Sequence, residues 1–274
     1  MKALIKIFAF ILIFSGVLIG VHYVLSSFFH KDTGLLLHHG IGQLTFYILF
    51  VLLVFIFQTY INRQRFLSLG LEPYSGWYVT LLKGWMTGVI AFTTYTILTK
   101  LFGVIDLQTK WSTERVLVAV MVAFSAFGIA LTEEILFRGF FLQTFLKDLP
   151  VWISVVITGI VFIFFHDLTR ISSFWKEPRQ MMLAGGLFSL NILLCVAYLK
   201  SKALWLPIGI HSGLVYAKVF FMKMRLIQVV DPNSYLFGLG GDARRGFLAW
   251  VLFLSGILIL NLLISDRERK RISL

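Results

Sequence analysis

The chain has 274 residues, of which 58% are hydrophobic and only 14% are charged. Soluble domains carry about 25% charged residues, so this composition and a mean hydropathy of +0.87 exclude a soluble globular protein and indicate an integral membrane protein. The net charge of +12 is carried between apolar segments and in the tail "SDRERKRISL". This distribution favours contact with anionic lipid and speaks against a nucleic-acid partner. The one cysteine, Cys195, lies in an apolar segment and is interpreted as a packing residue.

Eight membrane-spanning segments are predicted when about 20 apolar residues are taken as one crossing. They lie near residues 4–25, 41–60, 78–99, 116–146, 151–170, 180–199, 204–223 and 246–264. The predicted fold class is therefore all-α, a polytopic membrane bundle in which residues 1–274 form a single domain. The first segment has no A-x-A cleavage site after it, so it is predicted to be a retained helix. Lys and Arg are slightly more numerous on the flanks that share a side with the termini, which favours cytoplasmic termini. The expected location is the plasma membrane.

Two features of the connections and spans bear on packing. The 22 glycines are spread through the apolar segments, as expected where membrane helices approach closely. The stretch "DPNSYLFGLGGDARRG", residues 231–246, belongs to the one long connection and is rich in turn residues. We interpret it as a linker rather than as a re-entrant or lid segment.

Among the 13 acidic residues, only Glu133 and Glu134 sit well inside a hydrophobic segment. A charge at the centre of a membrane helix costs about 2.5–3.5 kcal/mol on insertion scales and usually marks a functional site. Residues four apart share a helix face, so Glu134 can pair with Arg138, whereas Glu133 points elsewhere. We interpret the Glu134–Arg138 pair as structural and expect Glu133 to find its partner on another helix. The alternative is that all three charges form one structural network.

His166 and His211 are the candidate partners, because the other four histidines lie in the first span or the first loop. Phe162 lies one turn before His166, so an apolar ring and an imidazole are expected to face one cavity. His211 follows Pro207 and Gly209, which distort or begin a helix. If both spans begin at the same membrane face, the two imidazoles are offset along the bundle.

A glutamate in an apolar site together with two imidazoles can carry out hydrolysis. The carboxylate acts as a general base on water, one imidazole holds that water, and the second stabilises the oxyanion. Two histidines and a glutamate are also an acceptable zinc ligand set, but the sequence has no HExxH motif. The metal-dependent mechanism is the weaker alternative, and no cofactor is expected.

Three motifs in order resemble the CAAX protease and bacteriocin-processing family, also called the CPBP or Abi family, which includes the CAAX prenyl endoprotease. "EEILFR", Glu133 to Arg138, is similar to the family motif EExxxR, and "FIFFH", Phe162 to His166, is similar to FxxxH. "HSGLV", beginning at His211, takes the place of HxxxN or HxxxD. The resemblance covers roughly residues 80–264. It implies an intramembrane endopeptidase that uses a glutamate and needs no nucleophilic side chain.

By this resemblance, Glu133 is the general base, His166 its partner in activating water and His211 the oxyanion donor. Glu134 and Arg138 shape the site. The implied substrate is a peptide or protein, possibly lipidated, that is reached from the lipid bilayer or the cytoplasmic side. Neither the substrate nor the oligomeric state follows from the sequence.

The chain departs from the family pattern at Val215, because valine cannot donate the hydrogen bond that Asn provides. Either another polar group such as Ser212 or Asn191 takes the place of that donor, or the protein is a slow or specialised enzyme. A non-catalytic membrane scaffold or bacteriocin-immunity protein of the same fold is the alternative that Val215 suggests. A proton-coupled transporter that uses Glu133 and His166 as a relay is a further alternative.

Overall fold

The structure is a computed structural model that describes residues 2–28, 35–108, 114–167 and 177–263. In this part of the chain the α-helices are α1 (Lys2–Phe28), α2 (Leu35–Ile56), α3 (Trp77–Leu101), α4 (Glu114–Glu134), α5 (Gln143–Phe145), α6 (Val151–Asp167), α7 (Pro178–Ser201), α8 (Trp205–Lys223) and α9 (Phe247–Leu263). The π-helices are η1 (Phe57–Ile61) and η3 (Ile135–Leu142), and the 3₁₀-helices are η2 (Phe66–Leu69), η5 (Leu239–Gly241) and η6 (Ala243–Arg245). Two short strands, β1 (Ile105–Leu107) and β2 (Ile227–Val229), pair antiparallel with Ile105 opposite Val229. The all-α prediction is confirmed.

Each of the eight predicted spans coincides with a helix, but the number of membrane crossings is not confirmed. Four helical segments in the described ranges are long and apolar enough to cross a membrane, namely Lys2–Val21, Val116–Phe145, Pro178–Ser201 and Trp205–Lys223. Three further apolar helices are shorter. The ends of two predicted spans, at 168–170 and at 264, and the basic tail lie outside the described residues. Eight crossings therefore stay a prediction.

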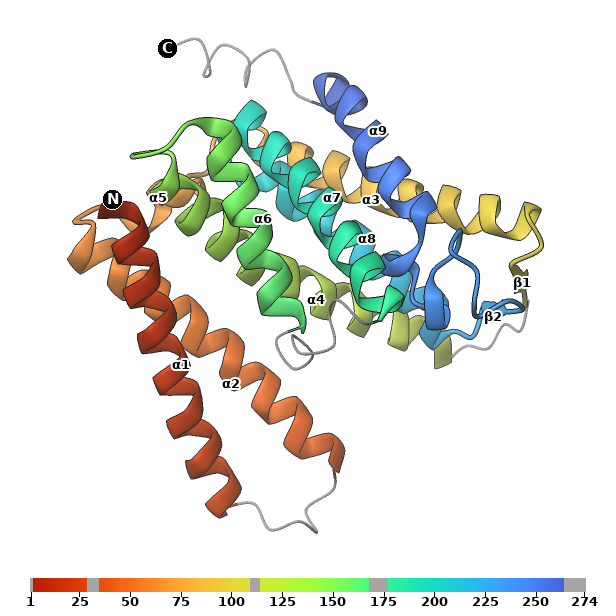
Figure 1. The fold of residues 1–274 in the computed structure, drawn as a ribbon, viewed down its shortest axis with the longest axis horizontal. Coiled ribbons are helices and arrows are strands. Elements are labelled where there is room, and N and C mark those ends of the chain that lie inside the picture. Colours follow the sequence, from red (N-terminus) through yellow and green to blue (C-terminus); the bar gives the residue numbers. More distant parts are fainter. Residues whose placement is uncertain (1, 29–34, 109–113, 168–176, 264–274) are drawn as a thin grey trace.

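The helices are arranged as a bundle with one hairpin that diverges from it. In Figure 1, α1 and α2 extend away from the other helices, while α6, α7, α8 and α9 lie next to one another and α3 crosses behind them. Helix α8 packs on both α3 and α4, and α7 packs on α6 and α9. This arrangement places α8 at the centre of the bundle.

Helices α3 and α8 approach closely through glycines spaced four residues apart on both. Gly84 and Gly88 of α3 face Gly209 and Gly213 of α8. A methyl group at Gly213 would lie 2.1 Å from the carbonyl oxygen of Trp85, and one at Gly88 would lie 2.3 Å from that of Ile210. Small residues at this spacing let membrane helices pack backbone to backbone. The predicted role of glycine in helix packing is found here.

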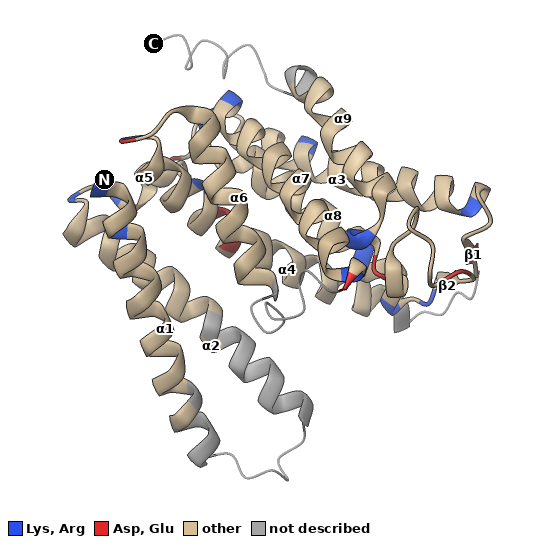
Figure 2. Ribbon diagram, viewed as in Figure 1, with Lys and Arg blue, Asp and Glu red and all other residues tan. Residues whose placement is uncertain are grey.

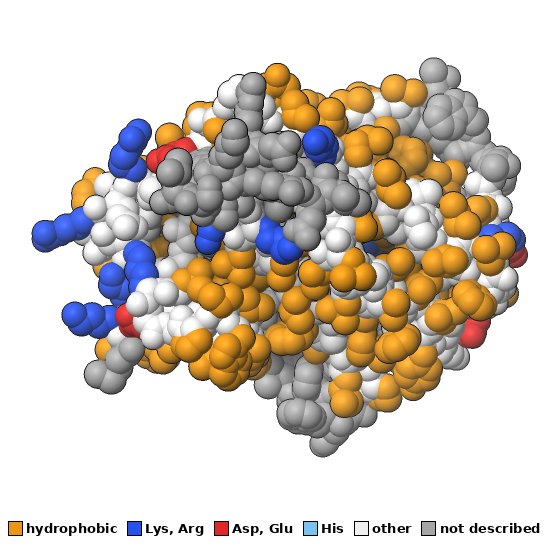
Figure 3. All heavy atoms as spheres, turned by 90° about the horizontal axis from the view of Figure 1, so that it is seen from above, with side chains coloured by type: hydrophobic (Ala, Val, Ile, Leu, Met, Phe, Trp, Pro, Cys, Tyr) orange, Lys and Arg blue, Asp and Glu red, His pale blue; other side chains and the backbone are white. Residues whose placement is uncertain are grey.

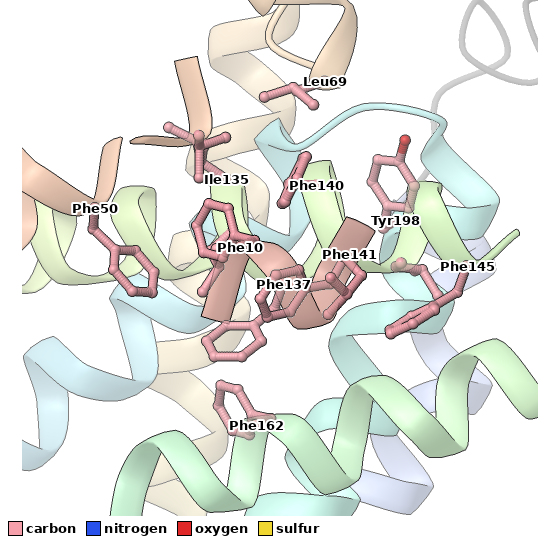
Figure 4. Close-up of a cluster of buried hydrophobic side chains, with 14 of the residues drawn as sticks. Phe10, Phe50, Leu69, Ile135, Phe137, Phe140, Phe141, Phe145, Phe162 and Tyr198 are labelled. Carbon is pink, nitrogen blue, oxygen red and sulfur yellow. The ribbon is translucent and has the colours of Figure 1, made fainter. Parts of the chain in front are cut away.

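A cluster of buried aromatic side chains joins the α1–α2 hairpin to η3. Figure 4 shows Phe10 and Phe50 from the hairpin beside Phe137, Phe140 and Phe141 of η3. The ring centroids of Phe10 and Phe140 are 5.0 Å apart, and Phe10 meets Phe141 edge-on at 5.5 Å. Such pairs add about 0.5–1.5 kcal/mol each beyond their buried area. The first two helices therefore support the helix that carries Arg138.

Charged and apolar residues separate on the outside of the bundle. Figure 3 shows apolar side chains over much of the face seen from above, with several Lys and Arg at its left edge and others farther along the face. In Figure 2 the acidic and basic segments lie mostly at helix ends and loops, except for an acidic stretch behind α6 within the bundle. An apolar outer surface with charges mostly at helix ends and loops is typical of a membrane protein.

Residues 231–246 are packed against the bundle and are not a free linker. Phe237 and Leu239 are buried, and the hydroxyl of Tyr95 donates to the carbonyl oxygen of Phe237. Lys218 of α8 pairs with Asp242 of this segment at 3.0 Å. The linker interpretation is therefore wrong for this stretch, because its apolar side chains have a helix surface to cover.

Candidate active site

Helix α4 ends with the adjacent residues Glu133 and Glu134, at the point where the α-helix changes to the wider π-helix η3. Glu134 is the last residue of α4, and the π-helix η3 begins at Ile135. Every residue of η3 is buried, including Arg138. Single π turns inside α-helices are frequent at functional sites, because they redirect the side chains next to them. The sequence carried no signal for this widening.

Glu134 and Arg138 form the predicted ion pair, and both side chains are fully buried. Arg138 Nη1 donates to Glu134 Oε1 at 2.9 Å, and its Nη2 donates to the amide oxygen of Asn191 at 3.2 Å. The same Glu134 oxygen also accepts a 2.7 Å hydrogen bond from His211 Nδ1. The pair therefore has a second role besides neutralising two buried charges, because Glu134 also fixes the position of the His211 ring.

Glu133 lies between the two predicted histidines. Its Oε2 is 3.5 Å from His166 Nε2 and 3.8 Å from His211 Nε2. Three helices, α4, α6 and α8, supply one residue each. The structure thus brings together the three residues that the sequence singled out, and the offset between the two spans does not keep the imidazoles apart.

The hydrogen bonds at the far side of each ring determine which nitrogen faces Glu133. His166 Nδ1 donates to the carbonyl oxygen of Phe162 at 2.8 Å, and His211 Nδ1 donates to Glu134. In a neutral His166 the other nitrogen, Nε2, is then an acceptor. Glu133 Oε2 is buried and has no hydrogen-bond partner among the described residues. Two acceptors, Glu133 Oε2 and His166 Nε2, therefore face one small volume, where they require a donor such as water.

The site opens into a cavity of about 270 Å³. Glu133, His166 and His211 line it at one part, and the rings and side chains of α3, α7 and α9 make most of its wall apolar. Phe162 also lines the cavity, with its ring centroid 4.3 Å from that of His166, as predicted from their spacing. A mostly apolar cavity with a few convergent polar groups is the usual form of a substrate site.

Val215 is among the described residues that line this cavity, whereas Asn191 and Ser212 are not. Asn191 uses its amide oxygen on Arg138 and donates from Nδ2 to the carbonyl oxygen of Val155 at 3.1 Å. Ser212 donates to the carbonyl oxygen of Gly209 at 3.0 Å. Replacement of the missing donor by either residue therefore stays a prediction.

Two cationic residues in the cavity wall were not singled out in the sequence. Lys218 and Arg244 both line it, and both bind Asp242. Lys218 is seven residues after His211, with Val215 between them, and this spacing defines one helix face. That spacing was a usable signal for Lys218, whereas Arg244 comes from the 231–246 segment and had none.

The geometry gives no support to a metal site of three or more protein ligands. Within the described ranges, no group of three or more His, Cys, Asp or Glu side chains is arranged to hold a metal ion. The arrangement instead suits general acid–base chemistry on a bound water.

Comparison with known proteins adds one finding. Residues 115–217 match the family model described as type II CAAX prenyl endopeptidase Rce1-like. No curated protein and no solved structure matches the chain. The match lies inside the predicted core of residues 80–264 and contains all three motifs. Residues 115–217 of this integral membrane protein are thus similar to the Rce1-like type II CAAX prenyl endopeptidases.

Proposed function

We propose that this protein is a membrane-embedded endopeptidase that hydrolyses a peptide bond with water activated by Glu133 and His166. The observation that carries the proposal is the convergence of Glu133 Oε2 with the Nε2 atoms of His166 and His211, which lie 3.5 and 3.8 Å from it. A water molecule has two protons to donate, one to Glu133 Oε2 and one to His166 Nε2. The Rce1-like match supports the same class of reaction.

In the proposed reaction, water donates to Glu133 and to His166 Nε2, which raises electron density on its oxygen. The oxygen attacks the peptide carbonyl carbon, a new C–O bond forms, and Glu133 takes the released proton. The C–N bond then breaks, and the departing amine receives that proton from Glu133. Phe162 keeps His166 oriented throughout, because its carbonyl oxygen holds the Nδ1 proton.

The proposed role of His211 is to donate a hydrogen bond to the oxyanion that forms when the carbonyl carbon is attacked. Its Nδ1 proton is held by Glu134, so it can donate from Nε2 only as the doubly protonated imidazolium. The Glu134 carboxylate accepts the Nδ1 proton of His211 and is itself held by Arg138, so these two residues fix the ring for this role. Glu134 and Arg138 are therefore positioning residues in this proposal. Val215 offers no donor, so His211 alone carries the hydrogen bond that the family shares between two side chains.

The substrate is proposed to be a peptide or protein segment, possibly lipidated, that reaches the cavity from the bilayer. The apolar wall of the cavity supports this proposal, since it would cover aliphatic side chains or a lipid chain. The plasma membrane is the proposed location. No metal or organic cofactor has a part in the reaction as proposed.

The test is cleavage of a peptide library by purified protein in lipid nanodiscs, followed by mass spectrometry of the products. Glu133→Gln keeps the shape of the side chain and removes the base, so cleavage should fall by about 10²–10⁴-fold. Glu177→Gln is the matched control, because Glu177 is exposed at the start of α7. Cleavage that persists in Glu133→Gln would refute the mechanism. A folded wild-type protein that binds peptides without cleaving them would instead favour the non-catalytic scaffold that Val215 suggests.

A further inference from the structure

Basic residues from separate segments of the chain gather at the start of α1. Lys6 belongs to α1, Arg63 and Arg65 follow η1, and Lys147 follows α5. In Figure 2 several Lys and Arg segments lie close to the N-terminal end of the chain. This region is one end of the apolar segment Lys2–Val21, where long basic side chains reach the headgroup layer of a bilayer. The proposed hydrolysis uses none of these residues.

A network of amide side chains positions Lys6 and Lys147. Lys6 Nζ donates to Asn62 Oδ1 at 2.8 Å, and Lys147 Nζ donates to Gln64 Oε1 at 3.4 Å. Gln58, which is only 2% exposed, connects these two amides. It accepts from Asn62 Nδ2 at 2.9 Å and donates to Gln64 Oε1 at 3.2 Å. Both lysines are therefore held on one platform, although they lie far apart in the sequence.

This platform is uncharged, so the two ammonium groups repel each other across it. Burial and, after it, the charge of Lys6 lower the pKa of Lys147. Among the described residues, both lysines donate to amide oxygens and neither forms an ion pair with a carboxylate. An anion that contacts both ammonium groups would relieve the repulsion and accept charge-assisted hydrogen bonds from each. The geometry thus favours a ligand with a phosphate group.

The surroundings of the two lysines favour a phosphate that carries hydrocarbon chains. Ile5, next to Lys6 in α1, is exposed, and so are Tyr60 and Ile61, which directly precede Asn62. These side chains continue the basic site as an apolar helix surface. A phospholipid fits both parts, because its phosphate accepts hydrogen bonds from lysine while its acyl chains cover the apolar side chains.

We propose that Lys6 and Lys147 bind the phosphate of an anionic membrane phospholipid, with Arg63 and Arg65 at the edge of the site. The bound lipid links α1 to the segment that follows α5, and so holds the α1–α2 hairpin against the bundle. The site is separate from the cavity that contains Glu133 and does not depend on peptidase activity.

The test measures the melting temperature of the purified full-length protein in detergent micelles with increasing amounts of one added compound. Phosphatidylglycerol should raise the melting temperature in a saturable way, by about 2–4 °C for each lysine engaged. Phosphatidylcholine should not, because its choline group neutralises its phosphate. Soluble glycerol phosphate at the same concentration should not either, because it has no acyl chains to cover the apolar surface.

Variants then assign the effect to the two lysines. Lys147→Gln keeps a hydrogen-bond donor for Gln64 and removes the charge, so half of the temperature shift should require about fivefold more phosphatidylglycerol. Without added lipid, Lys147→Gln should melt no lower than the wild type, because the repulsion from Lys6 is gone. Lys6→Gln should need the same excess of lipid, and Lys147→Arg should respond as the wild type does. Lys83→Gln, at an exposed position of α3, is the control and should leave the response unchanged.

An unchanged response to phosphatidylglycerol in both Lys147→Gln and Lys6→Gln would overturn the inference. An equal shift with phosphatidylcholine would also overturn it, because the negative charge of the lipid would then be irrelevant. An equal shift with glycerol phosphate would assign the two lysines to a free phosphate and refute the lipid site. None of these results bears on peptide cleavage, so the peptidase proposal stands or falls separately.

Discussion

Gly213→Ala tests whether the contact between α3 and α8 sets the geometry of the site. The added methyl carbon would lie 2.1 Å from the carbonyl oxygen of Trp85, 2.9 Å from its carbonyl carbon and 3.1 Å from the Cα of Gly88. The closest of these atoms is backbone on another helix, so it cannot rotate away. A carbon–oxygen contact needs about 3.3 Å, and α8 must therefore move by about 1 Å.

The expected cost has two parts. Overpacking of this kind destabilises a protein by about 1–3 kcal/mol. His211 lies two residues before Gly213, so the same movement changes its separation from Glu133, which is 3.8 Å in the native site. A misplacement of about 1 Å can lower the rate by about 10²-fold. The loss of activity should therefore exceed the loss that partial unfolding would explain.

The assay pairs thermal unfolding in detergent micelles with peptide cleavage below the melting temperature. Gly128→Ala is the matched control, because Gly128 lies in α4 and a methyl group there meets no other atom within 4 Å. Wild-type melting temperature and wild-type activity in Gly213→Ala would refute the reasoning. That result would mean that α8 can shift without moving the site.

Three further predictions concern the site itself. Arg138→Ala leaves the buried Glu134 without its cationic partner and should lower the free energy of unfolding by about 3–5 kcal/mol, seen as low expression and a lower melting temperature. Intact stability with lost activity would place Arg138 among the groups that act on the substrate. Val215→Asn restores a donor to the cavity wall and should leave kcat unchanged or raise it, and a large fall in kcat in a folded variant would contradict the oxyanion assignment. Alkylation of thiols should leave cleavage intact because Cys195 is buried away from the cavity wall, and chelation of metals should do so because the proposed water is activated by Glu133. Activity that is lost on chelation and regained with zinc would establish a metalloprotease.

Much of the candidate site could be predicted from the sequence, because lipid makes an ionisable residue conspicuous. Glu133 and Glu134 stand out among apolar residues, and the four-residue spacing from Glu134 to Arg138 predicts an ion pair that the structure contains. The same reasoning identified His166 and His211, since few other histidines were candidates. The all-α fold follows from the length of the apolar segments, because a backbone in lipid must satisfy its hydrogen bonds internally.

Only the tertiary structure decided how these residues meet. Counted along their spans, His166 and His211 lie about 22 Å and about 10 Å from the helix starts, so the sequence alone predicted an offset. The relative positions of α4, α6 and α8 remove that offset, and these depend on the glycine contact with α3 and on the aromatic cluster behind η3. Such contacts involve residues far apart in the chain, and no local spacing specifies them.

The surroundings of the site show the same division. Glu134 holds both Arg138 and His211, which a single-helix argument could not show, because His211 belongs to α8. The sequence also could not show that Asn191 binds Arg138 and the carbonyl oxygen of Val155, or that Ser212 donates to the carbonyl oxygen of Gly209. The sequence thus determined which groups must be buried and paired, since that cost depends on residue type and the surrounding solvent. Which partner each group takes depends on packing between distant segments, and that was decided only in three dimensions.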